Sequence, residues 1–151
     1  MDVSAVSRRR AEPVDREVLV ALIAAYYAYD HIAFDEASVR EGLATFLGDD
    51  SLGRAYLLQL GTQPVGYALV TFGFDLEFGG RLATLTDLYL QPKLRRARIG
   101  SETLRFIAAE CRELGVRALQ LEVERTNVAA QALYHAFGFR PLTRLPMVKL
   151  L

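Results

Sequence analysis

The stretch Thr84-Leu-Thr-Asp-Leu-Tyr-Leu-Gln-Pro92 is followed directly by Lys93-Leu-Arg-Arg-Ala-Arg-Ile-Gly-Ser101. An apolar strand ends at its proline, an arginine-rich loop follows, and Ile99-Gly100 begins a long amphipathic helix. Backbone amides at a helix N-terminus, with arginines beside them, form an anion-binding site. We therefore expect this loop to hold the pyrophosphate of a cofactor.

The composition limits the classes of partner. Eighteen basic and eighteen acidic residues cancel, so no global field favours nucleic acid or an anionic membrane, and phosphate binding must be local. The single cysteine, Cys111, excludes an internal disulfide and fits a reducing compartment. The sequence shows neither an apolar run as long as a membrane span nor a signal-peptide pattern at its N-terminus. We expect a cytoplasmic protein with residues 1–151 forming one domain.

Periodicity predicts a mixed α/β fold rather than a strict βαβ repeat. Helices are predicted at residues 14–29, 36–48, 99–114 and 128–137. Strands are predicted at residues 54–60, 65–72, 82–90 and 116–123. A short edge strand at residues 3–7 and a last strand at 145–151 are allowed by the pattern, and Arg8-Arg9-Arg10 is interpreted as a solvated turn.

Two motifs carry a resemblance to a known family. Arg95-Arg-Ala-Arg-Ile-Gly100, followed by a helix, is similar to the Arg/Gln-x-x-Gly-x-Gly loop of GNAT-type N-acetyltransferases. Asn127-x-x-Ala-x-x-Leu-Tyr-x-x-x-Gly-Phe139 resembles the family's second signature, and one helix and one strand separate the two, as in the family. The resemblance extends from about Gly53 to Phe139 and is nearest in character to small-molecule amine or polyamine acetyltransferases. It implies the GNAT fold, a mostly antiparallel mixed sheet splayed between central strands, with flanking helices and acetyl-CoA between the strands.

The resemblance also implies a set of cofactor-binding residues and no metal. The backbones of Leu88 and Leu90 would pair with pantetheine and polarise the thioester. The expected acetyl-CoA contacts are Leu88, Leu90, Arg95, Arg96, Ala97, Arg98, Ile99, Gly100, Ser101, Asn127, Ala130 and Tyr134. Arg98 stands where the family has its first loop glycine, so its Cβ could hinder close approach to phosphate. Its guanidinium could instead donate to phosphate oxygens or point to solvent, and the sequence leaves these alternatives open.

Three side chains are candidates for acid–base chemistry. Tyr134 occupies the position of the family's general acid, which protonates the departing thiolate; the alternative is an ordinary packed tyrosine. Asp87 is the carboxylate expected in a buried strand, where an isolated acid is costly, so we favour catalysis or amine binding over a purely structural role. Relatives carry an acidic pair in this strand, but here the first position is Thr86. Glu122 is the reserve base.

The acceptor pocket is expected from the first two helices and the loop at 72–81. Its candidate residues are Tyr26, Tyr27, Asp30, Phe34, Phe74 and Glu77. Aromatic faces and carboxylates suit a cationic amine, although each residue taken singly could equally fill the core. His31 and His135 are isolated and lack metal-ligand spacing.

These observations favour an N-acetyltransferase that moves an acetyl group from acetyl-CoA to a primary amine of a small molecule in a ternary complex. Acetylation of a peptide or protein, at an N-terminus or a lysine, is the alternative within the enzyme class. Arg98 and the missing acid at Thr86 motivate a non-catalytic acetyl-CoA-binding module, and a ligand-free oligomerisation domain is the third hypothesis. Homodimers are common among relatives, but the sequence shows no interface.

Overall fold

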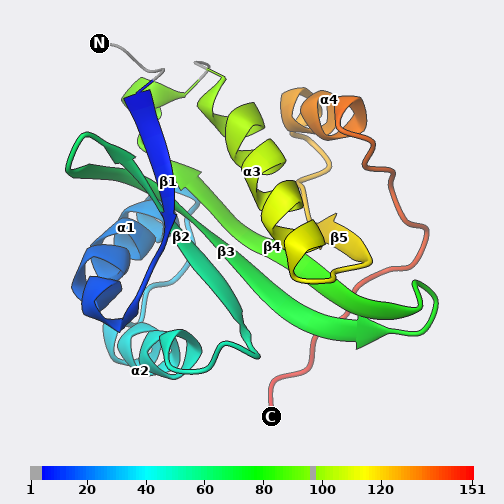
Figure 1. Ribbon diagram of the computed structural model, residues 1–151, viewed down its shortest axis with the longest axis horizontal. Helices are drawn as coiled ribbons and strands as arrows, with labels where there is room; N and C mark the ends of the chain where they lie inside the picture. The colour runs from blue at the N-terminus through cyan, green and yellow to red at the C-terminus, as the bar shows by residue number, and fades with distance from the viewer. Residues whose placement is uncertain (1–4, 96–97) are drawn as a thin grey trace.

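The structure, a computed structural model, describes residues 5–95 and 98–151, and its strands form one mixed sheet (Figure 1). The strands are β1 (Val6–Arg10), β2 (Gly53–Leu60), β3 (Gln63–Asp75), β4 (Gly80–Leu90) and β5 (Ala118–Leu121). They lie side by side in sequence order; β1 to β4 are antiparallel neighbours, and β5 runs parallel to β4. The predicted mixed α/β class, with a mostly antiparallel sheet, is confirmed.

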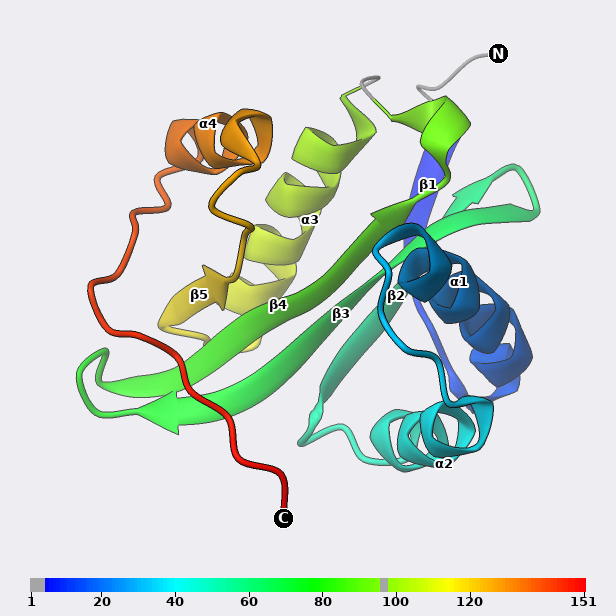
Figure 2. The ribbon, with the colours of Figure 1, turned by 180° about the vertical axis from the view of Figure 1, so that it is seen from behind.

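Helices cover both faces of the sheet (Figures 1 and 2). The helices are α1 (Arg16–Tyr29), α2 (Glu36–Leu47), α3 (Ile99–Glu113) and α4 (Val128–Ala136), with short 3-10 turns η2 (Pro13–Asp15) and η3 (Pro92–Leu94). α1 and α2 lie on one face and α3 on the other, with α4 beside α3 beyond β5. No described helix is both long and apolar enough to cross a membrane.

Each face of the sheet has its own apolar core. The α1 face is built around Leu19, Ile23, Leu57, Tyr67 and Tyr89. The α3 face is built around Tyr56, Val70, Leu85, Leu104 and Ile107. Full burial of one such side chain contributes about 1.5–3 kcal/mol, so packing on both faces fixes the sheet and the positions of its strand ends.

A β-bulge in β4 changes which residues face each core. Leu69 of β3 pairs with Asp87 and Val70 pairs with Leu85, so Thr86 is an extra residue without a cross-strand partner. Because side chains alternate along a strand, one inserted residue reverses the facing of everything after it. Leu85 therefore packs on the α3 face, whereas Asp87 contacts Tyr67 on the α1 face.

The N-terminal predictions are wrong in detail. The edge strand β1 is Val6–Arg10, whereas residues 3 and 4 of the predicted strand at 3–7 lie outside the described residues. Arg8-Arg9-Arg10 therefore lies in a strand and not in a solvated turn. The Arg8 side chain is only 12% exposed; its Nε donates to Thr103 Oγ1 at 2.8 Å and one terminal nitrogen donates to the Ile99 carbonyl at 3.1 Å. Arg8 thereby holds β1 against the first turn of α3.

The C-terminal predictions also need correction. Residues 145–151 form no strand; the tail runs as irregular chain past the β3–β4 hairpin, where Arg144 pairs with Glu77 at 2.6 Å (Figure 2). The predicted strand at 116–123 is shortened to the four residues of β5. Apolar patterning alone does not make a strand, because its backbone needs a partner, and Pro146 has no N–H to give one.

Candidate functional site

The sheet opens between β4 and β5. β5 pairs with β4 only along Leu82–Leu85, so among the described residues no strand pairs with residues 86–90 on that side. A cleft of about 790 Å³ lies at this opening. Its lining comprises Tyr26, Tyr29, Asp30, Leu58, Thr86, Leu88, Leu90, Arg95, Ile99, Gly100, Glu122, Val123, Glu124, Arg125, Thr126, Asn127, Ala130 and Tyr134. One cleft thus brings together the end of α1, the free edge of β4 and the N-terminal ends of α3 and α4.

The N-terminus of α3 closes one end of the cleft. Ile99 and Gly100 line it, and a Cβ added at Gly100 would meet nothing within 4 Å, so the helix start is open to a ligand. The first amides of a helix carry partial positive charge and suit phosphate. Ser101 also lies here, its hydroxyl donating to the Arg98 carbonyl at 3.0 Å. The predicted contacts Arg96 and Ala97 lie outside the described residues.

Arg98 precedes α3 with φ 65° and ψ 0°, a left-handed conformation. A residue other than glycine adopts this conformation at a cost of roughly 1–2 kcal/mol. The similar motif has a glycine at this position, and the backbone of Arg98 adopts a conformation that glycine favours. The chain keeps the loop conformation although it has an arginine there.

Arg95 joins the helical and sheet sides of the cleft. Its Nε donates to the Leu90 carbonyl at 2.9 Å, and its guanidinium carbon lies 3.9 Å from the ring centroid of Tyr29 at the end of α1. Leu88 and Leu90 are the two residues whose backbones are expected to contact pantetheine, and the carbonyl of Leu90 is already hydrogen-bonded to Arg95. Leu88 lies on the free edge of β4 and lines the cleft.

Tyr134 enters the cleft from α4. Asn127 caps this helix by accepting a hydrogen bond from the Ala130 N–H at 3.1 Å, which fixes the first turn. The Tyr134 ring packs edge-on against Phe139 at 5.8 Å, and burial raises the pKa of its hydroxyl above the ordinary value. Tyr134 consequently remains a neutral phenol at physiological pH and can act as a proton donor.

Asp87 lies on the α1 face among hydroxyl groups. Its Oδ2 accepts a hydrogen bond from the Tyr67 hydroxyl at 2.7 Å. Burial raises the pKa of Asp87, whereas the hydrogen bond from Tyr67 partly opposes that rise. A carboxylate whose pKa is raised binds a proton more readily than a free aspartate, which suits a proton acceptor.

Tyr26 links Asp87 to Tyr134. Burial is the main cause that raises the pKa of Tyr26 to about 12, and the charges of Asp87 and Asp30 and the hydroxyls of Tyr27 and Tyr134 add to it. Tyr26 and Tyr134 both line the cleft, whereas Asp87 is not part of the lining. Asp87 lies behind the Tyr26 wall, hydrogen-bonded to Tyr67, against which Tyr26 packs at 6.3 Å.

The remaining predicted residues divide into two groups. Glu122 and Asp30 line the cleft, and Tyr27 packs edge-on against Phe34 at 6.0 Å next to it. Phe74 and Glu77 lie on the β3–β4 hairpin, outside the described lining; Phe74 is 71% exposed and Glu77 pairs with Arg144. Within the described part of the chain, no three His, Cys, Asp or Glu side chains come together as a possible metal site.

Sequence reasoning did not identify Tyr67 and Tyr89 as part of this site. They are a directly opposed pair of β3 and β4, and their ring centroids lie 6.2 Å apart. The available signal was a tyrosine in each of two adjacent predicted strands. Without the register, nothing placed either ring beside Asp87.

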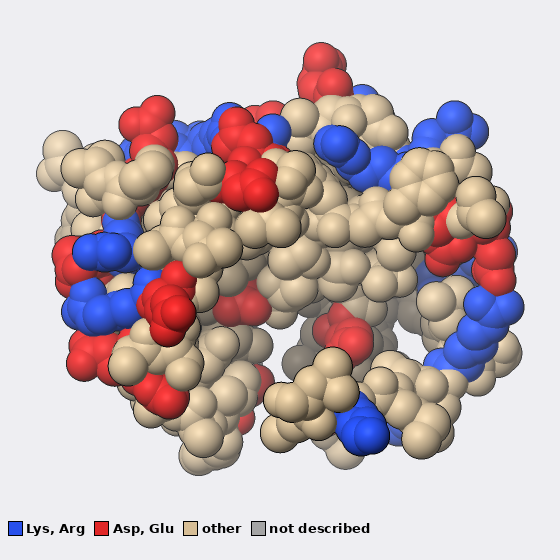
Figure 3. Space-filling view, turned by 90° about the horizontal axis from the view of Figure 1, so that it is seen from below, with Lys and Arg blue, Asp and Glu red and all other residues tan. Residues whose placement is uncertain are grey.

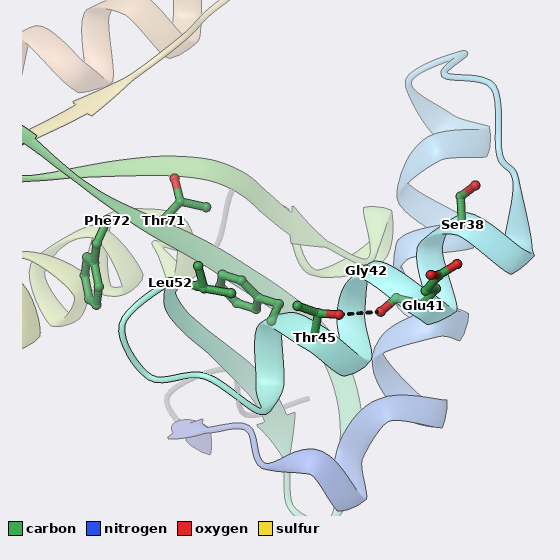
Figure 4. A pocket seen from close by; sticks show the side chains of 8 residues that line it. Ser38, Glu41, Gly42, Thr45, Leu52, Thr71 and Phe72 are labelled. Carbon is green, nitrogen blue, oxygen red and sulfur yellow. Dashed lines mark hydrogen bonds between the residues drawn. The ribbon is translucent and has the colours of Figure 1, made fainter. Parts of the chain in front are cut away.

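A second pocket of about 630 Å³ lies between α2 and β3 (Figure 4). Its lining comprises Ser38, Glu41, Gly42, Thr45, Phe46, Leu52, Thr71 and Phe72.

The face of the molecule seen in Figure 3 is hollowed near its centre, with acidic groups around the hollow and most basic groups toward the outline. An acidic surround of this kind favours a cationic partner.

The fold and the cleft together define the class of protein: an α/β protein whose sheet opens beside the N-terminus of a helix. The model of the acetyltransferase (GNAT) family matches residues 17–139. The chain belongs to this family, as its two motifs predicted.

Similar proteins point the same way. The chain is 35% identical over 79 residues to a thialysine N-epsilon-acetyltransferase of Bos taurus, covering 52% of this chain and 46% of that protein. It is 38% identical over 61 residues to the ribosomal protein bS18-alanine N-acetyltransferase of Escherichia coli K12, covering 40% of this chain and 41% of that protein. The match thus spans less than half the length of each of these relatives.

Among solved structures, an integron cassette protein from the Cole Harbour salt marsh metagenome has a TM-score of 0.84 and 30% identity, covering 95% of this chain and 90% of that one. A protein of Clostridium acetobutylicum, described as a predicted acetyltransferase with acetyl-CoA, has a TM-score of 0.81 at 16% identity, covering 95% and 96%. The second likeness concerns the fold alone.

Proposed function

We propose that the chain is an acetyl-CoA-dependent N-acetyltransferase whose acceptor is the primary amine of a small molecule. The observation that carries this proposal is a single cleft that holds the Tyr134 phenol, the free edge of β4 and the N-terminus of α3, with the Asp87 carboxylate behind its Tyr26 wall through Tyr67. Amine acetylation needs one group to accept a proton from the ammonium and another to donate a proton to the leaving thiolate.

The cleft supports acetyl-CoA as the co-substrate. Ile99 and Gly100 offer helix N-terminal amides to the pyrophosphate, Asn127 and Ala130 line the wall, and the free edge of β4 at Leu88 offers backbone groups to the pantetheine. Acetyl-CoA would supply the acetyl thioester. Membership of the acetyltransferase family supports this assignment, and a protein of the same fold is described with acetyl-CoA.

In the proposed mechanism, Asp87 attracts the acceptor as its ammonium ion and takes one proton from it, directly or through a water molecule. The neutral nitrogen then attacks the thioester carbonyl, and a backbone amide on the edge of β4 donates to the oxygen that becomes negative. Tyr134 gives its proton to the departing sulfur, whose conjugate thiol has a pKa of about 8–9. The second proton, which the nitrogen loses as the amide forms, returns the Tyr134 phenolate to the phenol, directly or through a water molecule. Glu122, which also lines the cleft, is the reserve base.

The acceptor side supports a cationic small molecule. Tyr26, Tyr27 and Phe34 present aromatic faces near Asp30 and Asp87, and such faces bind ammonium groups by about 0.5–2 kcal/mol each. The relative that acts on thialysine is compatible with this choice.

The direct test measures thiol release from acetyl-CoA with a panel of polyamines, amino acids, aminoglycosides and peptides. Activity with at least one amine is expected, and Tyr134→Phe should lower kcat by about 100-fold while calorimetric acetyl-CoA binding stays unchanged. If acetyl-CoA binds but no amine is acetylated and Tyr134→Phe changes nothing, the enzyme proposal fails. That outcome would support a binding module, for which the strained Arg98 is the motivating observation.

A second candidate acceptor is the N-terminus of a protein. The likeness to ribosomal-protein alanine acetyltransferases favours it, and the second pocket beside α2 could hold further residues of a peptide. A peptide with N-terminal alanine should then outcompete every small amine in the same assay. A reversed order would exclude the peptide as the main acceptor.

A further inference from the structure

Tyr67 lies at the centre of β3 with none of its surface exposed. Its hydroxyl donates to Asp87 Oδ2 at 2.7 Å across the β3–β4 pair. The two residues are diagonal neighbours, since Tyr67 pairs with Tyr89 and Leu69 pairs with Asp87. A tyrosine hydroxyl that reaches a carboxylate inside a sheet is a contact whose geometry both strands determine.

Two other rings hold Tyr67 in place. Tyr26 of α1 packs edge-on against it at 6.3 Å, and Tyr89 is tilted against it at 6.2 Å. Tyr26 and Tyr89 also contact each other, with centroids 5.9 Å apart. The three rings form a closed group, so the Tyr67 hydroxyl cannot turn away from Asp87 without disturbing the packing of α1.

The groups that act on Asp87 are hydroxyls rather than cations. Tyr67 donates a hydrogen bond to it at 2.7 Å, and the tyrosines Tyr26 and Tyr27 of α1 act on the same charge. The hydroxyl of the adjacent Thr86 donates to the Leu69 carbonyl at 3.3 Å. A nearby cation, the Arg95 guanidinium, lies over the rings of Tyr29 and Tyr89 and donates to the Leu90 carbonyl. Among the described residues, the charged form of Asp87 therefore depends on the wholly buried hydroxyl of Tyr67.

We propose that Tyr67 is a positioning residue of the acceptor site, whose buried hydroxyl fixes one oxygen of Asp87 and keeps this carboxylate charged for the incoming ammonium. This inference rests on the proposed function. Burial keeps the pKa of Tyr67 well above its ordinary value, so the phenol stays protonated and always acts as the donor. Its hydrogen bond lowers the pKa of Asp87 against the effect of burial.

The test is Tyr67→Phe, which removes the donor and keeps the ring. The acidic limb of the kcat/KM profile for the amine should move to higher pH, and kcat/KM at neutral pH should fall about tenfold, with partial recovery at higher pH. The KM for acetyl-CoA should stay unchanged. The matched control is Tyr56→Phe in β2, a tyrosine 2% exposed that packs on Phe106 at 5.1 Å in the other core. This control should leave the limb in place.

A carbon-13 NMR titration of the Asp87 carboxyl, without any substrate, tests the role of Tyr67 separately from the proposed acetyltransferase function. A higher midpoint in Tyr67→Phe than in the wild type and in Tyr56→Phe supports the inference. An unchanged midpoint, or equal shifts in both variants, overturns it whatever the activity. If the midpoint rises but the wild type acetylates no amine, the proposed function is contradicted and the role of Tyr67 in holding Asp87 charged still stands.

Discussion

Two largely buried aspartates, Asp15 and Asp87, lie in opposite electrostatic surroundings. Asp15, in η2, is 7% exposed and accepts from both terminal nitrogens of Arg9 at 2.8 and 2.9 Å and from the Glu12 N–H at 2.8 Å. The hydrogen bond from Arg9 lowers the pKa of Asp15. Asp87 has hydroxyl partners, and burial raises its pKa.

The difference shows how the same side chain serves two purposes. A carboxylate paired with a guanidinium is held charged and gives up almost all affinity for protons, which suits a fixed structural contact. A carboxylate among hydroxyls is stabilised less and keeps its affinity for protons, which suits exchange with a substrate. Both aspartates are shielded from water, and the guanidinium partner of Asp15 separates it from Asp87, the acid proposed to act on the substrate.

The largest expected effect is on activity. Asp87→Asn should lower kcat/KM for the amine by about 100- to 1,000-fold, because the amide cannot accept the ammonium proton. Calorimetry should show unchanged acetyl-CoA binding. Asp15→Asn is the matched control and should keep wild-type kinetics at a temperature where it is folded. Comparable losses in both variants would contradict the division into structural and functional acids.

The next effect is on stability at the structural acid. Asp15→Asn should lower the free energy of unfolding by about 2 kcal/mol at pH 7, because it removes charge-assisted hydrogen bonds. The pKa of Asp15 is lower in the folded chain than in the unfolded chain, so its contribution is present above about pH 4 and is lost as the pH falls through the folded pKa. Urea unfolding from pH 7 to pH 3 measures this. A loss that is constant with pH would show that the ion pair is not its cause.

The opposite sign is expected at Asp87, the acid proposed to act on the substrate. The pKa of Asp87 is raised on folding, so its favourable contribution exists in the protonated form and is lost as the pH rises through the folded pKa. Asp87→Asn should therefore be more stable than the wild type at pH 7, by less than the loss at Asp15, and equal to it at low pH. The same urea titrations check this, and a destabilised variant at pH 7 would show that the charge of Asp87 is compensated.

The smallest expected effect is that of Arg98→Gly on the free energy of unfolding, and it should not depend on pH. Arg98→Gly should raise the free energy of unfolding by about 0.5 kcal/mol, since relief of the left-handed conformation outweighs the greater freedom of glycine in the unfolded chain. The gain should be the same at pH 4 and pH 7. Calorimetric acetyl-CoA affinity measured on the same variant would show whether the Arg98 side chain aids or hinders phosphate binding.

The sequence allowed prediction of features that depend on neighbouring residues. The arginine-rich loop, the start of α3, and Asn127 as the cap of the helix that carries Tyr134 were all recognisable because their chemistry lies within a few residues. The order of helices and strands followed from periodicity in the same way. The predicted role of Tyr134 as general acid stays a prediction.

Features that depend on pairing between distant segments were not predictable. The Tyr67–Asp87 contact joins residues twenty positions apart through a register that no local pattern reports. Arg8 and Arg9 had the appearance of a solvated charge run, yet their partners Thr103 and Asp15 are supplied by α3 and η2. The predicted strand at residues 145–151 failed for the converse reason, since its apolar pattern met no partner.

The bulge at Thr86 determines which face of the sheet the Asp87 carboxylate occupies. In a regular ladder without the bulge, Thr86 would pair with Leu69 and Asp87 with Ala68, so the carboxylate would point to the α3 core instead of the tyrosines. The same residues would then lack the proposed amine site. Deletion of Thr86 would remove the bulge and still leave Asp87 opposite Leu69, so in comparisons between relatives the pairing register at this point, and not the residue count alone, reports on the position of the acid.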